Sequence, residues 1–365
     1  MIMGTELDQP LLLVDQERRL DPSTGSGQAL LVVDNLAVSF RRRGREPFVA
    51  VDGVSFTVRP GEIVGIVGES GSGKSVTSMA IMGLLPRRSA VITGAARYRG
   101  QNLIGRSAAE LSSLRGRELA MVFQDPMSSL NPVLPIGLQV TEVLRRHQQI
   151  TRADARDEAE DLLRRCGIPD PARRLREYPH QLSGGMRQRA LIAIALACKP
   201  KLLICDEPTT ALDVTIQAQV LELLSELVRD LGTAMIMITH DLGVVAGLCD
   251  TVNVMYAGRV VETAERRELF AHPQHRYTEG LLSSIPRLDA PRGEPLHPIP
   301  GTPRDVVPWT KACAFAPRCR HADEACVRSD LQLVDSTRPD HPVRCVHPVD
   351  APGPSTGSGN DGDDG

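Results

Sequence analysis

The chain is poor in aromatic residues, carries almost no net charge and contains no long apolar run. Phe, Trp and Tyr make up 3% of its 365 residues, which argues against a surface that stacks nucleic-acid bases. Its 42 Lys and Arg against 45 Asp and Glu leave a net charge of −3, so no strong field points to nucleic acid. No segment reaches the about 18 consecutive apolar residues of a membrane-spanning helix. We therefore expect membrane contact only through a partner.

Both ends of the chain have the composition of flexible extensions. Residues 1–28 begin without a basic start or a long apolar stretch, so we expect no secretion signal and a cytoplasmic protein. The string PSTGSG occurs at 22–27 and again at 354–359, and residues 350–365 end in an acidic, solvated tail. The remaining length suffices for one large domain and a small one.

A glycine-rich loop with the sequence GESGSGKS spans Gly68–Ser75. It follows an apolar run at 62–67 that predicts a buried strand, and it precedes a predicted helix at 75–85. Lys74 is expected to reach the β- and γ-phosphates of a nucleotide, and the Ser75 hydroxyl to ligate Mg²⁺. A plain turn would also use glycines, but strand, loop and helix favour a phosphate site. We assign nucleotide binding to Gly68, Ser70, Gly71, Ser72, Gly73, Lys74, Ser75 and Val76.

Two adjacent carboxylates end a strand predicted at 201–205. Asp206 is expected to hold Mg²⁺, directly or through water, and Glu207 to polarise the attacking water. The string PTTALD at 208–213 follows at once, and we count Asp213 among the nucleotide-binding residues.

Two further polar side chains are expected near the γ-phosphate. His240 follows a buried strand predicted at 234–238, where its imidazole can donate a hydrogen bond. Gln124 follows the strand predicted at 121–123, and its amide can ligate Mg²⁺ and orient water. The loop at 124–132 is a natural hinge, so we expect its conformation to depend on which nucleotide is bound.

The string LSGGM at 182–186 lies about 110 residues after the glycine-rich loop. It indicates which class of ATPase carries that loop. Ser183, Gly184 and Gly185 precede a predicted helix and offer bare N–H groups to an anion. In this order the motifs of residues 29–288 resemble the ATPase subunits of ABC transporters. The resemblance implies an α/β fold: a P-loop ABC ATPase with a RecA-like core, an antiparallel β subdomain and a helical subdomain at about 126–195.

The resemblance also implies a mechanism that needs two chains. In the family, two such domains close head-to-tail, so that Ser183 and Gly185 of one would cap the γ-phosphate held by the glycine-rich loop of the other. Met186 stands where the family usually has Gln, a variant that looks like the peptide-importer branch. The family also stacks an aromatic ring on adenine. Phe48 is our candidate for this ring. The alternative is that Phe48 is a strand residue packed in the core at 48–51.

The eight cysteines fall into two groups. Four lie in apolar helix or strand patterns, where thiols behave as small hydrophobes, and are assigned no function: Cys166, Cys198, Cys205 and Cys249. Four fall within 33 residues of a predicted C-terminal module at 289–349: Cys313, Cys319, Cys326 and Cys345. Because a reducing cytosol does not sustain disulfides, we expect a metal or a cluster to hold this module together. The spacing lacks the short pairs of structural zinc and favours an iron–sulfur cluster, with zinc as the alternative.

The same segment is similar to the C-terminal extension of oligopeptide and dipeptide importer ATPases. The similarity is carried by HPQHRYT at 272–278, PIPGTP at 298–303 and CAFAPRC at 313–319. Some members of that branch bind a [4Fe–4S] cluster through four such cysteines. His321 is a possible substitute ligand, although an exposed polar residue is the simpler interpretation.

The branch resemblance is to the D-type half of a D/F pair and implies a transport ATPase. Its expected partners are a second, F-type ATPase chain, two permease subunits and an extracytoplasmic substrate-binding protein, at the cytoplasmic face of the membrane. One alternative is a soluble ABC ATPase that acts on nucleic acid or ribosomes, with the cysteine module as a binding finger; an exporter subunit is another. Soluble relatives generally carry two cassettes or a long coiled coil, and this sequence has neither.

Overall fold

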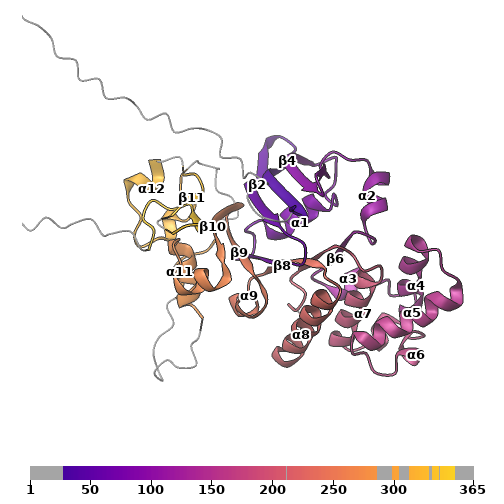
Figure 1. Ribbon diagram of the computed structural model, residues 1–365. Helices are drawn as coiled ribbons and strands as arrows, with labels where there is room; N and C mark the ends of the chain where they lie inside the picture. Colours follow the sequence, from indigo (N-terminus) through magenta and orange to yellow (C-terminus); the bar gives the residue numbers. More distant parts are fainter. Residues whose placement is uncertain are drawn as a thin grey trace, which may run out of the picture.

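The computed structural model describes residues 28–210, 212–285, 298–303, 312–328, 331–336 and 338–349. The predicted extensions, apart from Gln28, lie outside these residues, as does part of the predicted module at 289–349. Two sheets and a set of helices are built from the described residues (Figure 1).

The larger sheet has eight strands in the order β11-β12-β10-β9-β3-β8-β7-β6. The five from β9 to β6 run parallel to one another, and the other three add antiparallel pairs at one edge. Buried apolar runs such as IVGIV, with helices over both faces of the sheet, are typical of parallel strands. The strands are β3 (Ile63–Val67), β6 (Leu119–Val122), β7 (Leu202–Asp206), β8 (Ala234–Thr239), β9 (Thr251–Tyr256), β10 (Arg259–Glu265), β11 (Val334–Asp335) and β12 (Pro342–Val343).

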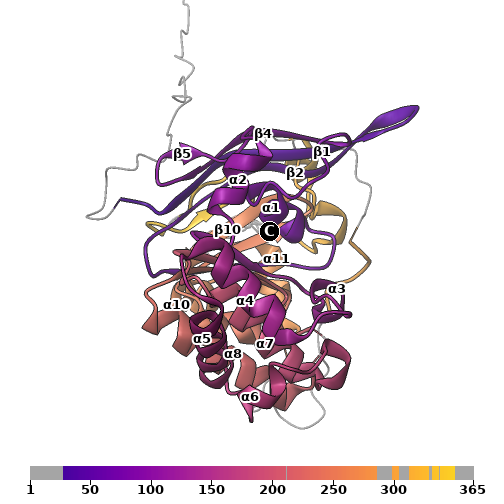
Figure 2. The same cartoon turned by 90° about the vertical axis from the view of Figure 1, so that its right-hand side faces the viewer.

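The smaller sheet is antiparallel, in the order β2-β1-β4-β5, and packs against α1. In Figure 2 it lies above helices α4, α5, α7 and α8. Its strands are β1 (Leu31–Arg42), β2 (Arg45–Val58), β4 (Ala90–Tyr98) and β5 (Gln101–Asn102).

The helices gather in a layer beside the larger sheet and in a separate lobe. The lobe contains α3 to α7 and lies on the right in Figure 1. The helical subdomain at about 126–195 remains a prediction. None of the helices in the described part of the chain is long and apolar enough to cross a bilayer. The helices are α1 (Lys74–Ile81), α2 (Ala108–Leu114), α3 (Pro126–Ser129), α4 (Ile136–His147), α5 (Arg152–Arg165), α6 (Pro171–Arg174), α7 (Gly184–Leu196), α8 (Val214–Asp230), α9 (Leu242–Leu248), α10 (Arg266–Ala271), α11 (Arg276–Ser283) and α12 (Glu324–Arg328).

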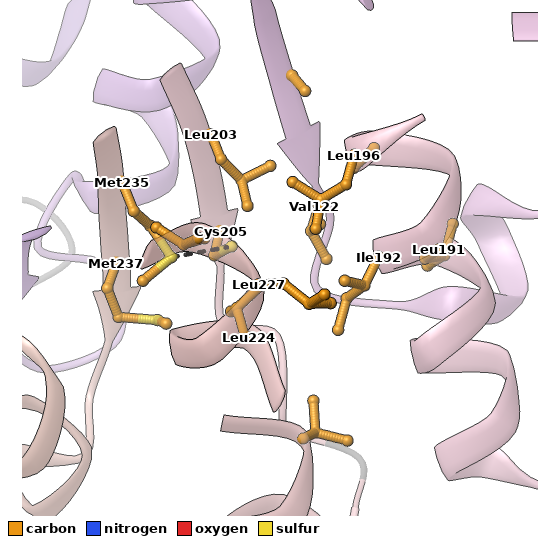
Figure 3. Packing of buried hydrophobic residues seen from close by; sticks show 14 of the residues in the cluster. Val122, Leu191, Ile192, Leu196, Leu203, Cys205, Leu224, Leu227, Met235 and Met237 are labelled. Carbon is orange, nitrogen blue, oxygen red and sulfur yellow. Dashed lines mark hydrogen bonds between the residues drawn. The ribbon is translucent and has the colours of Figure 1, made fainter. Parts of the chain in front are cut away.

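The main apolar core lies between the larger sheet and helices α7 and α8 (Figure 3). Leu203 and Met235 on adjacent strands face Ile192 of α7 and Leu224 of α8. Cys205 is fully buried there, with its Sγ 3.8 Å from the sulfur of Met235, and burial raises the pKa of its thiol. This packing fixes the strands whose ends form the site, and it gives Cys205 the structural role expected from the sequence.

The C-terminal residues around β12 are joined to the larger sheet. Val343 of β12 pairs with Glu262 of β10, and the buried His341 Nε2 lies 2.7 Å from the Glu262 carboxylate. The same carboxylate accepts hydrogen bonds from the backbone N–H groups of Gln274 and His275, at 2.6 and 2.9 Å. The boundary predicted at 289 remains a prediction, but the strands beyond it belong to the sheet of the preceding domain.

Candidate functional site

The glycine-rich loop leaves β3 and enters α1, so its N–H groups lie at the positive end of that helix. Gly73, the residue before the helix, has φ +99°. Lys74 Nζ donates hydrogen bonds to the carbonyl oxygens of Gly68 and Glu69, at 2.7 and 3.0 Å. Burial lowers the pKa of Lys74. Its ammonium is thus held inside the loop, where a triphosphate would meet it.

A cavity of about 350 Å³ opens beside this loop. Its lining includes Phe48 on β2, which places the candidate adenine-stacking ring next to the phosphate site, and the Arg42 guanidinium lies 4.5 Å from the centre of that ring. The other lining residues are Val49, Ala50, Ser70, Gly71, Ser72, Gly73, Lys74, Ser75, Val76, Gln124, Glu207 and Ala257.

Ser75 and Asp206 meet at the floor of the site. The Ser75 hydroxyl donates to Asp206 Oδ1 at 2.9 Å, although the two residues lie on α1 and at the end of β7. Burial raises the pKa of Asp206, while this hydrogen bond and Lys74 act in the opposite direction. A hydroxyl and a carboxylate are the hard oxygen ligands that Mg²⁺ prefers, so this pair fits the predicted metal site.

Three side chains lie next to the Glu207 carboxylate. Gln124 Nε2 and Thr210 Oγ1 donate to its Oε2 at 3.0 and 2.8 Å, and His240 Nδ1 lies 3.4 Å from the same oxygen. Glu207 also has φ +46°, a left-handed conformation that is costly for a residue with a side chain. The structure therefore brings Gln124, Glu207 and His240 together. Thr210 was not assigned from the sequence, although it lies in the string after the two acids.

Ser183 and Asp213 lie away from this cavity and cap helices. The Ser183 hydroxyl accepts from Met186 N at 3.3 Å at the start of α7, with Gly184 and Gly185 in the first turn. Asp213 accepts from Ile216 N at 3.0 Å at the start of α8. None of these residues lines the cavity. Their predicted contacts with ATP thus remain a prediction that requires a second chain.

The four C-terminal thiols lie near one another. Burial is the main cause that raises the pKa of Cys313 and of Cys345, the latter to about 11, and the charges of neighbouring thiols add to it. No three of their sulfur atoms lie within 4.8 Å of one another. In the described part of the chain, one group of three possible metal-ligand atoms does lie this close together, from Asp323, Cys326 and His347.

Replacing Gly68 by Ala should weaken ATP binding by distorting the phosphate loop. Gly68 has φ +151°, and an added Cβ would lie 2.1 Å from the carbonyl oxygen of Met255, so the loop would have to move. We expect ATP affinity to fall at least tenfold in a direct binding measurement. Gly61→Ala is the control, because Gly61 also has positive φ but has open space around it. Equal affinities for the two variants would contradict this reading of the loop.

Comparison with known proteins agrees with this geometry. The family description "ABC transporter" matches residues 51–210, and "Oligopeptide/dipeptide transporter, C-terminal region" matches 261–326. The oligopeptide transport ATP-binding protein OppD of Salmonella typhimurium is 48% identical over 88% of this chain and 94% of that protein. The dipeptide transport ATP-binding protein DppD of Bacillus subtilis is 52% identical over 84% and 94%.

Among solved structures, the dimeric, post-hydrolysis form of the ATP-binding cassette MJ0796 bound to ADP and Pi superposes with a TM-score of 0.59. It is 28% identical and covers 65% of this chain and 99% of that cassette. The high identity to the two transport proteins extends over nearly their whole length and includes the C-terminal segment. The chain therefore belongs to the ABC transporter ATPases, in the oligopeptide/dipeptide branch of that family.

Proposed function

We propose that this chain hydrolyses ATP to drive the import of peptides through a partner permease. The observation that carries the proposal is the meeting of five groups at the carboxyl ends of parallel strands: the glycine-rich loop, Gln124, Asp206, Glu207 and His240. Ligands of open parallel sheets bind at this edge. The branch-specific C-terminal segment favours peptide transport over the alternative of a nucleic-acid or ribosome ATPase.

In the proposed mechanism, each group has one task. The loop and Lys74 bind the phosphates, while Ser75 and Asp206 would hold Mg²⁺, which would supply positive charge to the phosphoryl oxygens. Glu207 takes a proton from the attacking water, and Gln124 and His240 orient the water and the γ-phosphate. Ser183 and Gly185 of a second chain complete the pocket, and its closure moves a permease docked near residues 124–132.

The experiment that tests this function purifies the chain from its native membrane in mild detergent and identifies what accompanies it. We expect a second, F-type ATPase chain, two permease subunits and an extracytoplasmic binding protein, together with ATP hydrolysis stimulated by peptide-loaded binding protein. Ribosomes or DNA in place of permease subunits would support the soluble alternative.

We further propose that the cysteine module holds a [4Fe–4S] cluster through Cys313, Cys319, Cys326 and Cys345. Zinc with bonds of about 2.3 Å would draw four sulfurs to about 3.8 Å from one another. No three of the four sulfurs lie within 4.8 Å of one another, so they do not form the tight tetrahedron of a zinc site, which favours the wider spacing of a cubane. The group of Asp323, Cys326 and His347 is where zinc would find a nitrogen, an oxygen and a sulfur instead.

Protein purified without oxygen should be brown, with broad absorbance near about 400 nm. Metal analysis should give about four irons per chain, and Cys345→Ser should lose most of them. His347→Gln is the matched variant, because it removes the nitrogen donor of the other group and should leave the iron in place. Colourless protein with one zinc per chain, lost in His347→Gln, would assign the metal to the second group.

A further inference from the structure

The glycine-rich loop is held from the side opposite the nucleotide cavity. Glu69, its second residue, does not line the cavity. Its carboxylate is bound by Arg318 of the cysteine module through two hydrogen bonds, Nη1 to Oε2 at 2.6 Å and Nη2 to Oε1 at 3.0 Å. The two residues are 249 positions apart in the sequence.

This ion pair has the features of a strong one. The Arg318 side chain is 7% exposed and that of Glu69 is 25% exposed. Paired, largely buried guanidinium and carboxylate groups with two parallel hydrogen bonds are stronger and more directional than surface pairs. The hydrogen bonds that Arg318 donates to Glu69 are the main cause that raises the pKa of Arg318.

Arg318 is itself fixed on the module. It ends the short helical turn Ala316–Arg318, directly before Cys319 and five residues after Cys313. Its Nε donates to the carbonyl oxygen of Pro300 at 2.8 Å. The position of its guanidinium therefore follows the segment between the two cysteines.

A group of aromatic rings attaches the same segment to the ATPase domain. Phe315 lies with its ring centre 5.4 Å from those of Tyr256 and Tyr277, which are themselves 4.7 Å apart. The Tyr277 hydroxyl accepts the backbone N–H of Glu69 at 2.9 Å. In a chain with so few aromatic residues, three of them meet behind the phosphate loop.

These contacts continue to the phosphate-binding lysine. The Glu69 carboxylate accepts from Arg318, and the Glu69 N–H donates to the Tyr277 hydroxyl. The carbonyl oxygen of Glu69 accepts a hydrogen bond from Lys74. We propose that Arg318 is a positioning residue of the nucleotide site: through Glu69 it fixes the phosphate loop, so that the folded cysteine module sets the affinity for ATP. The inference rests on the proposed function in taking ATP as the ligand, and its Cys319→Ser comparison also uses the metal proposed for the module.

The test measures kcat and KM for ATP, with direct ATP binding, in a double-mutant cycle of Arg318→Gln and Glu69→Gln. Each single variant should raise KM and Kd about tenfold with little change in kcat, because neither residue faces the reacting atoms. The double variant should be no weaker than the singles, since both remove the same ion pair. Factors that multiply to about a hundredfold, or a Kd unchanged in both singles, would overturn the proposal.

Arg338→Gln is the matched control. Arg338 Nη1 lies 2.7 Å from Glu268 of α10, so this pair also ties the C-terminal segment to the ATPase domain, but away from the loop. If Arg318 served only to attach the module to the ATPase domain, Arg318→Gln and Arg338→Gln would lower the thermal stability by similar amounts. Both variants would then keep the Kd of the unaltered chain for ATP. Glu69→Gln keeps the test open if Arg318→Gln fails to fold, because it removes the same pair without altering the module.

A second comparison tests the dependence on the module itself. Cys319→Ser alters the residue next to Arg318 and should raise Kd for ATP about tenfold in the otherwise unaltered chain. In the Arg318→Gln background it should add nothing. An unchanged Kd in Cys319→Ser protein that has lost its metal would contradict the role of the module. Failure of the proposed function looks different, since ribosomes or DNA would then accompany the unaltered chain in place of permease subunits, whatever the Kd of these variants for ATP.

Discussion

ATP hydrolysis should fall by about 10²–10⁴-fold when Glu207 is replaced by Gln, while ATP binding persists. Glutamine keeps the size of the side chain and an oxygen for the hydrogen bonds from Gln124 and Thr210, but it cannot take a proton from water. The substitution therefore slows the chemical step and leaves the residues that bind the phosphates and Mg²⁺ in place. Single-turnover measurement of phosphate release, alongside ATP binding, separates the two effects.

Glu222→Gln provides the control for this substitution. Glu222 is an exposed residue of α8, so the same change there should leave the rate within about twofold of the unaltered chain. Near-normal hydrolysis in Glu207→Gln would show that Glu207 is not the general base. Gln124 and His240, which both lie next to Glu207 Oε2, would then be the candidates for activating the water.

Replacing Lys74 by Met should have the second large effect, on binding. Lys74 is 4% exposed and already makes two hydrogen bonds to the loop, so its ammonium is poised for the triphosphate. Truncating one partner of a buried, hydrogen-bonded charge pair costs about 2–5 kcal/mol, which corresponds to a loss of ATP affinity of about 30-fold or more.

The matched change for Lys74→Met is Lys201→Met, at an exposed lysine just before β7. Titration with labelled ATP should show unchanged affinity for Lys201→Met. Tight ATP binding by Lys74→Met would mean that the loop N–H groups alone carry the phosphate contacts.

Much of the fold and of the site follows from local patterns. Apolar runs with glycine-rich or acidic ends predicted β3, β7 and β8, and parallel strands necessarily bring Gln124, Asp206 and Glu207 to one edge. The predicted helix at 75–85 ends earlier, at Ile81, because Gly83 takes a positive φ. Element order and motif spacing are thus enough to identify an ATPase of this kind.

What the sequence did not reveal depends on contacts between distant segments. Arg318 and Glu69 are ordinary charged residues in their local context, and Tyr277 lies in a segment that indicated only the family branch. Similarly, nothing in the short strand β12 shows that it will pair with β10. Such contacts arise from the tertiary packing of the C-terminal segment, for which periodicity and motif spacing provide no signal.

The central claim is that two chains enclose each ATP, and the mass of Glu207→Gln protein with and without Mg·ATP tests it most directly. Light scattering on the eluting protein should show single chains without nucleotide and two-chain particles with it, either as a pair of this chain or with the F-type chain proposed as its partner. The additional change Ser183→Arg should abolish the pairing while ATP stays bound. Single chains that remain saturated with ATP in the presence of the partner would contradict the account.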